Sequence, residues 1–394
     1  MKVCFLSVEP IHDQPRIRRQ GDALHTAGYE VVAIGSTGGR SPEPAWRVVE
    51  LDLPRLSGGD RLLATARQAS SALGERAALA AYWSDARRRA VRDAAIAERA
   101  DVYVAREWRT LPIAVAACEV TGAGLAMDSP ELSAEESEES AVWRRFFRPM
   151  VVAIERRYLP QAQLVTAVTG RIGDILQQRY ALAARPTPVR NMPPYEEHPL
   201  RPVGEIVSVL YLGGLLPGRG IEQVIESVSR WPANWRLTLQ GPGGDEYVAS
   251  LRRLAVPVSE RVDIPGAVPL TEMVSIAARS DIGIFAHQPN GRQASLALPN
   301  KLFEYMMAGL AVCVSDMPSM REVVEEAGAG VLIPAPYGVS EIASAIEQLE
   351  ASDIVAFKRA ALAAARHLNW EHESQGYVAA FSAAFGPPEP TSAR

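Results

Sequence analysis

Cysteine is scarce in this chain of 394 residues, which contains only Cys4, Cys118 and Cys313. The three lie far apart in apolar surroundings and lack the spacing of metal ligands. Thiols placed in this way are small core residues of a protein in a reducing compartment, so we expect no disulfide. Long apolar runs are missing too, because the run at residues 3–8 ends at Glu9, too early for a signal peptide or a membrane span. We therefore expect a cytoplasmic protein.

Positive charge is also in deficit. The 41 lysines and arginines are outnumbered by 46 aspartates and glutamates, which gives a net charge of −5. This balance argues against a general nucleic-acid binder, so we expect no nucleic-acid partner. The first apolar run is followed by EPIHDQ and not by G-x-G-x-x-G, the loop that holds the pyrophosphate of a dinucleotide. A dinucleotide-dependent oxidoreductase is therefore disfavoured.

What the chain does contain is an alternation of strand-length apolar runs and helical segments. Its length exceeds what one hydrophobic core supports, so we expect two domains of similar size. The runs at 3–8 and 30–34 flank a helical segment, which is the β-α-β pattern of a parallel sheet. Residues 60–99 predict two helices with a break near Ser84. The proline-rich stretch NMPPYEEHP, at 191–199, indicates a linker between the domains.

The most informative stretch is SLALPNKLFEYMMAGLAVCVSD, at 295–316. Pro299 suits a first helical position and Gly309 suits the residue after a helix end, so we expect a helix over 299–308. One side of this helix is polar and should face solvent or a cleft, and the other is apolar. The polar positions are Asn300, Lys301, Glu304 and Tyr305, and the apolar positions are Leu302, Phe303, Met306 and Met307.

The polar side has the chemistry of a nucleotide diphosphate site. The amide groups and positive dipole end at Pro299 to Lys301 favour an anion such as phosphate, and the lysine adds a full charge. The carboxylate of Glu304, one turn further on, accepts hydrogen bonds and suits the paired hydroxyls of a ribose. An ordinary amphipathic helix with a solvated Lys301–Glu304 pair would give the same pattern.

The stretch PNKLFEYMMAGLAV followed by SDMPSMREVV resembles the donor-site signature of retaining glycosyltransferases of family 4, which have the GT-B fold. Further similarity lies in YLGGLLPGRGIE at 211–222, LQGPGG at 239–244 and GAVP at 266–269. The resemblance implies an α/β protein with two Rossmann-like domains facing a central cleft. An acceptor-binding domain would span 1–195 and a nucleotide-sugar-binding domain 204–369, with a final helix at 370–386 that crosses back to the first domain.

The resemblance also implies which residues bind the donor. Arg219 stands where relatives carry a basic residue that grips the pyrophosphate, and Gly214 replaces a second basic residue, whose charge we expect Lys301 to supply. The catalytic candidates are Arg219, Lys301 and Glu304. The full donor-binding set is Gly213, Gly214, Arg219, Gly241, Val268, Pro299, Asn300, Lys301, Leu302 and Glu304. The family commonly has a glutamate that touches the transferred sugar at the position where this chain has Leu296.

The acceptor side shows a weaker match. The loop EPIHDQPRI has Asp13 and Arg16 where one branch of the family has Asp-x-x-Arg, although these residues could simply cap the next helix. The segment DSPEL, at 128–132, resembles an Asp-x-His-Glu motif whose histidine is replaced by proline. Arg106 stands where relatives often have a histidine. The acceptor candidates are therefore Asp13, Arg16, Arg106, Asp128 and Glu131.

The function implied is transfer of a sugar, with retention, from a nucleotide diphosphate-sugar to an acceptor hydroxyl. UDP-, GDP-, ADP- and TDP-sugars remain open as donors, and no permanently bound cofactor is expected. A metal-held diphosphate needs carboxylates in close array, and the chain has no Asp-x-Asp, so we expect no metal. His287 is expected to be part of the loop structure. The alternative function is an inactive GT-B partner of another transferase, which would bind a nucleotide or glycan.

The acceptor could be a small molecule, a glycan or a lipid-linked molecule. In AVWRRFFRPM, at 141–150, Trp143 and two phenylalanines alternate with arginines. Such a helix can lie on an anionic membrane surface, which would give weak peripheral contact. A core-facing helix with solvated arginines explains the same pattern. The acidic run at 135–139 is expected to be an exposed loop or helix start.

Overall fold

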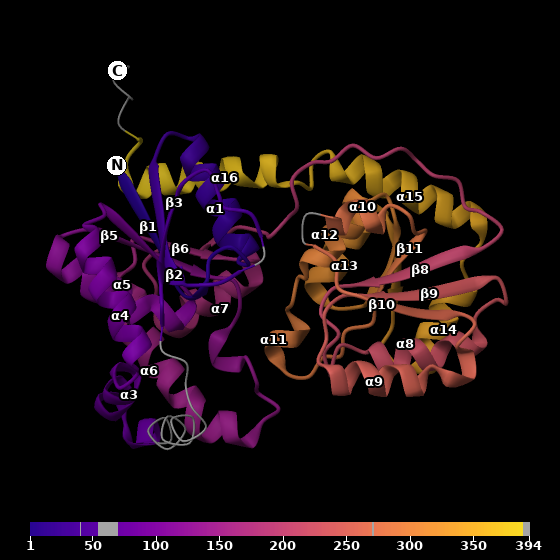
Figure 1. Cartoon of the computed structure of the whole chain (residues 1–394), viewed down its shortest axis with the longest axis horizontal. Helices are drawn as coiled ribbons and strands as arrows, with labels where there is room; N and C mark the ends of the chain where they lie inside the picture. The colour runs from indigo at the N-terminus through magenta and orange to yellow at the C-terminus, as the bar shows by residue number, and fades with distance from the viewer. Residues whose placement is uncertain (40, 54–69, 270–271, 389–394) are drawn as a thin grey trace. The chain divides into compact units, whose positions relative to one another are not determined.

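The computed structural model describes residues 1–39, 41–53, 70–269 and 272–388. The chain forms two compact units (Figure 1), the first made of Met1–Arg190 with Ser374–Arg394, the second of Asn191–Glu373. In each unit helices cover a parallel sheet. The first part of the helical region expected at 60–99 lies outside the described residues, and the rest forms α3 (Glu75–Trp83) and α4 (Ala86–Glu98) with the expected break.

The first unit has a seven-stranded sheet in the order β3-β2-β1-β4-β5-β6-β7, with every pair parallel. Its strands are β1 (Lys2–Pro10), β2 (Glu30–Ser36), β3 (Arg47–Leu51), β4 (Val102–Arg106), β5 (Gly124–Ser129), β6 (Leu164–Ala167) and β7 (Thr187–Pro188). Its other helices are α1 (Pro15–Thr26), α5 (Glu107–Thr121), α6 (Arg148–Tyr158) and α7 (Gly170–Tyr180), with short turns at η1 (Ser70–Leu73), η2 (Ser133–Glu135), η3 (Trp143–Phe147) and η4 (Leu159–Gln161).

The last helix, α16 (Trp370–Phe385), packs on the first unit from Ser374 onward. The ring of Phe381 meets Tyr29 edge-on, with 5.3 Å between centroids, and the Tyr29 hydroxyl donates to the carbonyl of Gly386 over 2.8 Å. Tyr377 and Phe381 of this helix are buried. Figure 1 shows the yellow C-terminal helix on the first unit.

The second unit has a six-stranded parallel sheet in the order β10-β9-β8-β11-β12-β13. Its strands are β8 (Val207–Leu212), β9 (Trp235–Gln240), β10 (Val262–Gly266), β11 (Ile282–Phe285), β12 (Ala311–Ser315) and β13 (Gly330–Ile333). Its helices are α8 (Ile221–Ser227), α9 (Asp245–Leu254), α10 (Met273–Ala277), α11 (Arg292–Ser295), α12 (Asn300–Met307), α13 (Pro318–Ala327), α14 (Val339–Glu347) and α15 (Ala351–Ala365), with short turns at η5 (Val228–Arg230) and η6 (Val256–Val258).

The strand order reverses once in each sheet, between β1 and β4 in the first unit and between β8 and β11 in the second. In open parallel sheets, ligands bind outside the carboxyl ends of the strands at such a switch point. A ligand site in the second unit is therefore expected at the carboxyl ends of β8 and β11.

Tyr305 occupies this position, although we expected it on the polar side of its helix. Its side chain is fully buried, and its hydroxyl accepts from the amide of Leu212 over 2.9 Å and donates to the carbonyl of Ile284 over 3.1 Å. The ring lies against Gly283, where a Cβ atom would come within 2.3 Å of it. The expectation was wrong because two strand ends offer the hydroxyl backbone partners inside the core.

The acidic run at 135–139 also differs from its expectation at one end. Glu135 is buried, and both its carboxylate oxygens accept from Arg179, over 2.6 and 2.9 Å. Beside it lies Glu155, which is buried as well and accepts from the hydroxyl of Tyr180 over 2.5 Å. Burial raises the pKa of Glu155 to about 7, against hydrogen bonding by Tyr180, which lowers it.

The raised pKa of Glu155 predicts that the first unit becomes less stable as the pH rises through 7. An unfolded glutamate has a pKa of about 4.3, so the folded protein binds more protons between these values. The contribution is complete below about pH 4 and lost above pH 7, and amounts to roughly 4 kcal/mol. Glu155→Gln should remove this pH dependence, so that its unfolding free energy exceeds that of the wild type at pH 8. Denaturant unfolding at pH 5 and pH 8 measures the difference.

The matched control is Glu139→Gln, because Glu139 is exposed. This control should unfold like the wild type at both pH values. A wild-type protein as stable at pH 8 as at pH 5, together with a destabilised Glu155→Gln, would mean that the carboxyl is ionised and held by its partners.

Candidate functional site

Helix α12 begins at the switch point of the second sheet. Pro299 is extended, with φ −74° and ψ 141°, so it precedes the helix and Asn300 is the first helical residue, one later than expected. Gly309, with φ 72°, follows the helix end in the left-handed region, as expected. Leu302 and Phe303 are fully buried in the core of this unit. The first turn is thereby fixed at the carboxyl ends of β8 and β11.

Lys301, in this first turn, lies against aromatic rings. Its Nζ atom is 4.0 Å from the ring centroid of Tyr211 and 4.1 Å from that of Phe285. Burial holds the pKa of Lys301 well below its usual range, the charge of Arg219 lowers it further, and Glu304 opposes both. In the part of the chain that the structure describes, neither Lys301 nor Arg219 forms a salt bridge with a carboxylate. The two basic side chains therefore have no salt-bridge partner in that part of the chain, although the buried carboxylate of Glu304 lies one turn after Lys301.

The glycine loop at 213–220 packs closely on the surrounding backbone. A Cβ atom at Gly241 would lie 2.0 Å from the carbonyl oxygen of Gly213, and one at Gly220 would lie 1.9 Å from that of Ala286. Gly213 has φ 116°, and a Cβ atom there would come within 3.3 Å of the Lys301 Nζ. No other residue fits these positions, so the loop is held beside the lysine.

The remaining members of the predicted donor set differ in exposure. Glu304 is buried, one turn after Lys301, and its charge acts on that lysine. Pro299, Asn300, Gly214 and Val268 are half-buried. Leu302 points into the core, so only its backbone could meet a ligand. The structure thus brings Gly213, Gly241, Lys301 and Glu304 to one end of the sheet, with Arg219 in electrostatic reach.

His287 has more contacts in this site than its sequence context indicated. It follows the end of β11, and its ring stacks on Phe285 with 5.2 Å between centroids and 7° between planes. Burial, with Arg219 and Lys301, lowers its pKa to about 4, so the ring is neutral at pH 7. Its buried Nδ1 atom has no hydrogen-bond partner among the described residues.

Sequence reasoning missed Tyr211 and Phe285 altogether. Tyr211 is the second-last residue of β8 and Phe285 is the last of β11. The signal that could have found them is an aromatic residue at the carboxyl end of each strand that flanks the switch point. That signal requires the strand order, which a single sequence does not provide.

In the first unit, two acceptor candidates bind each other. The guanidinium of Arg16 donates to both carboxylate oxygens of Asp128, each over 2.7 Å, and to the carbonyl of Val189 over 2.6 Å. Thr166 also donates to Asp128, over 2.6 Å. Both charged side chains are buried, and the Arg16 charge lowers the pKa of Asp128 against the effect of burial. The pair joins α1 to β5 and to the segment after β7.

The other acceptor candidates do not hydrogen-bond to this pair within the described residues, although Arg106 lies opposite Asp128 on the neighbouring strand and its charge acts on that carboxylate. Asp13 accepts from the amide and hydroxyl of Ser41, over 3.2 and 3.1 Å, and Glu131 is exposed. Arg106 ends β4 at the switch point of the first sheet, and its buried Nη1 atom has no hydrogen-bond partner among the residues described. The next residue, Glu107, has φ 56°, a strained conformation for a non-glycine residue.

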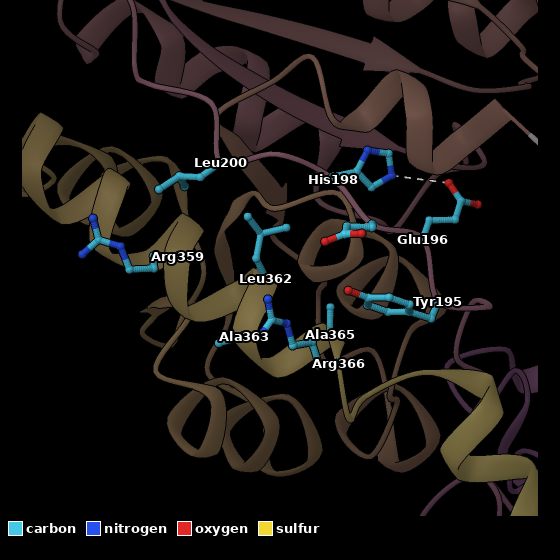
Figure 2. A pocket seen from close by; sticks show the side chains of 10 residues that line it. Tyr195, Glu196, His198, Leu200, Arg359, Leu362, Ala363, Ala365 and Arg366 are labelled. Carbon is cyan, nitrogen blue, oxygen red and sulfur yellow. Dashed lines mark hydrogen bonds and ion pairs between the residues drawn. The ribbon is translucent and has the colours of Figure 1, made fainter.

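A pocket of about 360 Å³ lies elsewhere in the second unit (Figure 2). The segment after the first unit forms one side and helix α15 the other, with Tyr195, Glu196, His198, Leu200, Arg359, Leu362 and Arg366 among its lining residues. His198 lies 3.4 Å from the Glu196 carboxylate, the contact dashed in Figure 2. None of the predicted donor residues lines this pocket, so it is distinct from the site at the switch point.

Among the residues that the structure describes, no cluster of three or more histidine, cysteine, aspartate or glutamate side chains has the arrangement of a metal site. Over the same ranges, no helix combines the length and apolar character that crossing a membrane requires.

Comparison with known proteins gives matches to glycosyltransferases. Residues 207–352 match the family model described as glycosyl transferases group 1. No curated protein sequence matches the chain significantly. Among solved structures, sucrose-phosphate synthase from Thermosynechococcus elongatus is 17% identical, with a TM-score of 0.71 over 97% of this chain and 100% of that one.

Two further structures extend the comparison. HepE from Anabaena, in complex with UDP-glucose, is 16% identical with a TM-score of 0.70, over 97% of this chain and 100% of that one. WaaG, a glycosyltransferase involved in lipopolysaccharide biosynthesis, is 16% identical with a TM-score of 0.67, over 96% and 98%. At these identities the likeness concerns the fold. The chain therefore has the two parallel-sheet α/β domains of GT-B glycosyltransferases, and its second domain matches the group 1 glycosyltransferase family.

Proposed function

We propose that this protein is a retaining glycosyltransferase that moves a sugar from a nucleotide diphosphate-sugar to an acceptor hydroxyl. The observation that carries the proposal is the meeting of Lys301 and Arg219 with the glycine loop at 213–220, at the switch point of the second sheet. Two cations that form no carboxylate salt bridge among the described residues, beside backbone amides, suit a diphosphate. The solved complexes of HepE with UDP and with UDP-glucose support a nucleotide sugar as donor and make UDP the first nucleotide to test.

In this proposal the charged groups act on the leaving diphosphate. Negative charge grows on the diphosphate as the glycosidic bond breaks, and preorganised cations stabilise that charge more in the transition state than in the ground state. A bound diphosphate would also favour the ammonium form of Lys301, against the burial that lowers its pKa. Glu304 would accept hydrogen bonds from the ribose. The leaving phosphate would take the proton of the incoming hydroxyl, as the family resemblance implies.

The acceptor would bind to the first domain, in a protein that we expect to be cytoplasmic. Of the candidates there, Arg106 has the best support, because it lies at the switch point and its buried Nη1 has no hydrogen-bond partner in the described chain, although its Nη2 pairs with Glu107 over 3.5 Å. Arg16 and Asp128 satisfy each other, so we assign them the role of fixing this end of the sheet. Asp13 and Glu131 remain acceptor candidates on position alone.

The alternative function is an inactive GT-B partner that binds a nucleotide or glycan. Leu296, at the position of a sugar-binding glutamate in the family, is the feature that favours it. The two functions differ in donor turnover, since slow hydrolysis of a nucleotide sugar that depends on Glu304 is expected of the enzyme alone.

The donor site predicts nucleotide binding that depends on Glu304. We expect one of UDP, GDP, ADP and TDP to bind to the wild type in a calorimetric panel, and Glu304→Ala to weaken that binding by about 1–3 kcal/mol, the cost of unmade hydrogen bonds in a buried site. The matched control is Glu326→Ala, because Glu326 is an exposed residue of α13. Binding of none of the four nucleotides would reject the proposed function, and equal affinities for wild type and Glu304→Ala would reject the ribose assignment.

The charge at the site predicts that turnover needs no divalent metal. Lys301 and Arg219 contribute one positive charge each and the start of α12 roughly half a charge, which nearly balances a diphosphate. A magnesium ion would also have to give up hydration water that it holds tightly. Donor turnover should therefore survive exhaustive EDTA treatment. Loss of turnover, with recovery on adding Mg²⁺ or Mn²⁺, would show that this charge balance is incomplete.

A second proposal concerns weak contact with an anionic membrane. A groove of about 420 Å³ in the first unit is lined by Arg144, Arg148 and Arg156, with Glu75 beside them in a 2.8 Å salt bridge to Arg157. Leu73, which adjoins the groove, is 84% exposed. Basic residues near apolar side chains suit the surface of an anionic bilayer, although the protein as a whole carries a charge of −5.

This proposal predicts binding to vesicles that contain phosphatidylglycerol but not to vesicles of phosphatidylcholine alone. The double variant Arg144→Gln with Arg148→Gln should bind roughly 30-fold less in a sedimentation assay, since each basic residue contributes about 1 kcal/mol at such a surface. The control is Arg253→Gln with Arg279→Gln, two exposed arginines of the second unit. Equal binding to both kinds of vesicle, or equal losses in the two double variants, would reject this surface.

A further inference from the structure

The ammonium group of Lys301 has two aromatic rings as its neighbours and no carboxylate salt bridge within the described chain. The Nζ atom lies 4.0 Å from the ring centroid of Tyr211 and 4.1 Å from that of Phe285. Both distances are well within the range of a cation–π interaction, which strengthens when the groups are removed from water. We call these two rings the aromatic pair.

The aromatic pair is fixed by the fold. Tyr211 and Phe285 are fully buried, on the two strands that flank the switch point, and their centroids are 6.2 Å apart at an angle of 46°. The hydroxyl of Tyr211 donates to the carbonyl of Gly214 over 3.0 Å, which ties the ring to the glycine loop. On its other side, Phe285 stacks against His287. The rings therefore cannot turn away without disturbing the sheet or the loop.

A ring attracts the ammonium without neutralising its charge, and this distinguishes the aromatic pair from a carboxylate. Glu304 lies one turn after Lys301, at the spacing of an i,i+3 ion pair, and its charge already acts on the lysine. A lysine bound to that carboxylate would have to break the pair before it could bind a phosphate. A lysine held over rings keeps its charge available for an incoming anion.

We propose that Tyr211 and Phe285 are positioning residues that hold the Lys301 ammonium in place for the diphosphate of the donor. The inference rests on the proposed function and adds residues to the same site. It assigns the two rings a part in recognising the nucleoside diphosphate through the lysine, with no direct contact to the ligand. Residue 213 is a glycine with φ 116°, a conformation that other residues rarely adopt, and a Cβ atom there would also crowd the Nζ atom at 3.3 Å.

The experiment compares the affinities of UDP and UMP by calorimetry, because their ratio isolates the contribution of the second phosphate. Tyr211→Leu should lower this ratio roughly 3- to 30-fold, the equivalent of a partly to fully desolvated cation–π contact. Tyr211→Phe keeps the ring and should leave the ratio within about twofold of the wild type. Phe285→Leu should act like Tyr211→Leu, and it replaces that variant if far-UV circular dichroism shows that Tyr211→Leu does not fold.

A double-mutant cycle with Lys301→Met separates positioning from a general loss of structure. If the rings act through the lysine, Tyr211→Leu changes the UDP to UMP ratio no further in the Lys301→Met background. The matched control is Phe303→Leu, because Phe303 is buried on the core side of α12, and its ratio should equal that of the wild type.

The outcomes distinguish this inference from the proposed function. The positioning role would be overturned if Tyr211→Leu left the UDP to UMP affinity ratio unchanged, or lowered it equally with and without Lys301. In either case, UDP binding by the wild type would still support the proposed function. A wild-type protein that binds none of the four nucleoside diphosphates would reject both.

Discussion

The hydroxyl of Tyr305 satisfies two buried backbone groups at the point where strands β8 and β11 of the second unit separate. Strands β8 and β11 pair at Val209 and Leu210 with Ile282 and Gly283, and beyond these residues they part at the switch point. The amide of Leu212 and the carbonyl of Ile284 then need partners inside a dry core. Tyr305 supplies both from one atom, and its ring fits because residue 283 has no side chain. Helix α12 is thereby anchored at the opening between the strands.

The position of Tyr305 determines where Lys301 and the aromatic pair lie. Lys301 precedes Tyr305 by four residues, so it lies one turn toward the helix start, beside the glycine loop that follows β8. The aromatic pair comes from the two strand ends that Tyr305 connects. A single buried side chain thus fixes the strands, the helix and the lysine relative to one another, and the site is built on rigid elements.

Much of this arrangement could be predicted from the sequence, and the failures have a common cause. The parallel β-α architecture and the helix after Pro299 follow from local patterns, namely apolar periodicity and the proline and glycine at the helix ends. The GT-B fold is implied by the resemblance of the surrounding motif to a known family. The burial of Tyr305 and Glu135 and the pairing of Arg16 with Asp128 depend on partners far away in the chain. Arg16 and Asp128 are 112 residues apart. Periodicity identifies a polar side chain but not the polar group that it meets inside the fold.

The two units use charge at the ends of their sheets in opposite ways. In the first, Arg16 is neutralised by Asp128, with Thr166 and the carbonyl of Val189 completing the hydrogen bonds. Removing one member of such a buried pair costs about 3–5 kcal/mol, so its natural role is to hold the sheet together. In the second unit, Lys301 and Arg219 lack a carboxylate salt bridge among the described residues.

Placing these basic groups together in a buried site costs free energy. Burial lowers the pKa values of Lys301 and His287, the charge of Arg219 lowers both further, and at Lys301 the charge of Glu304 opposes this. A protein gains nothing in stability from this arrangement. Lys301 and Arg219 lie beside tightly packed glycines and form no carboxylate salt bridge among the described residues. This combination is typical of a site that binds an anion. The contrast between the two sheets therefore supports the proposed diphosphate site in the second unit independently of any likeness to other proteins.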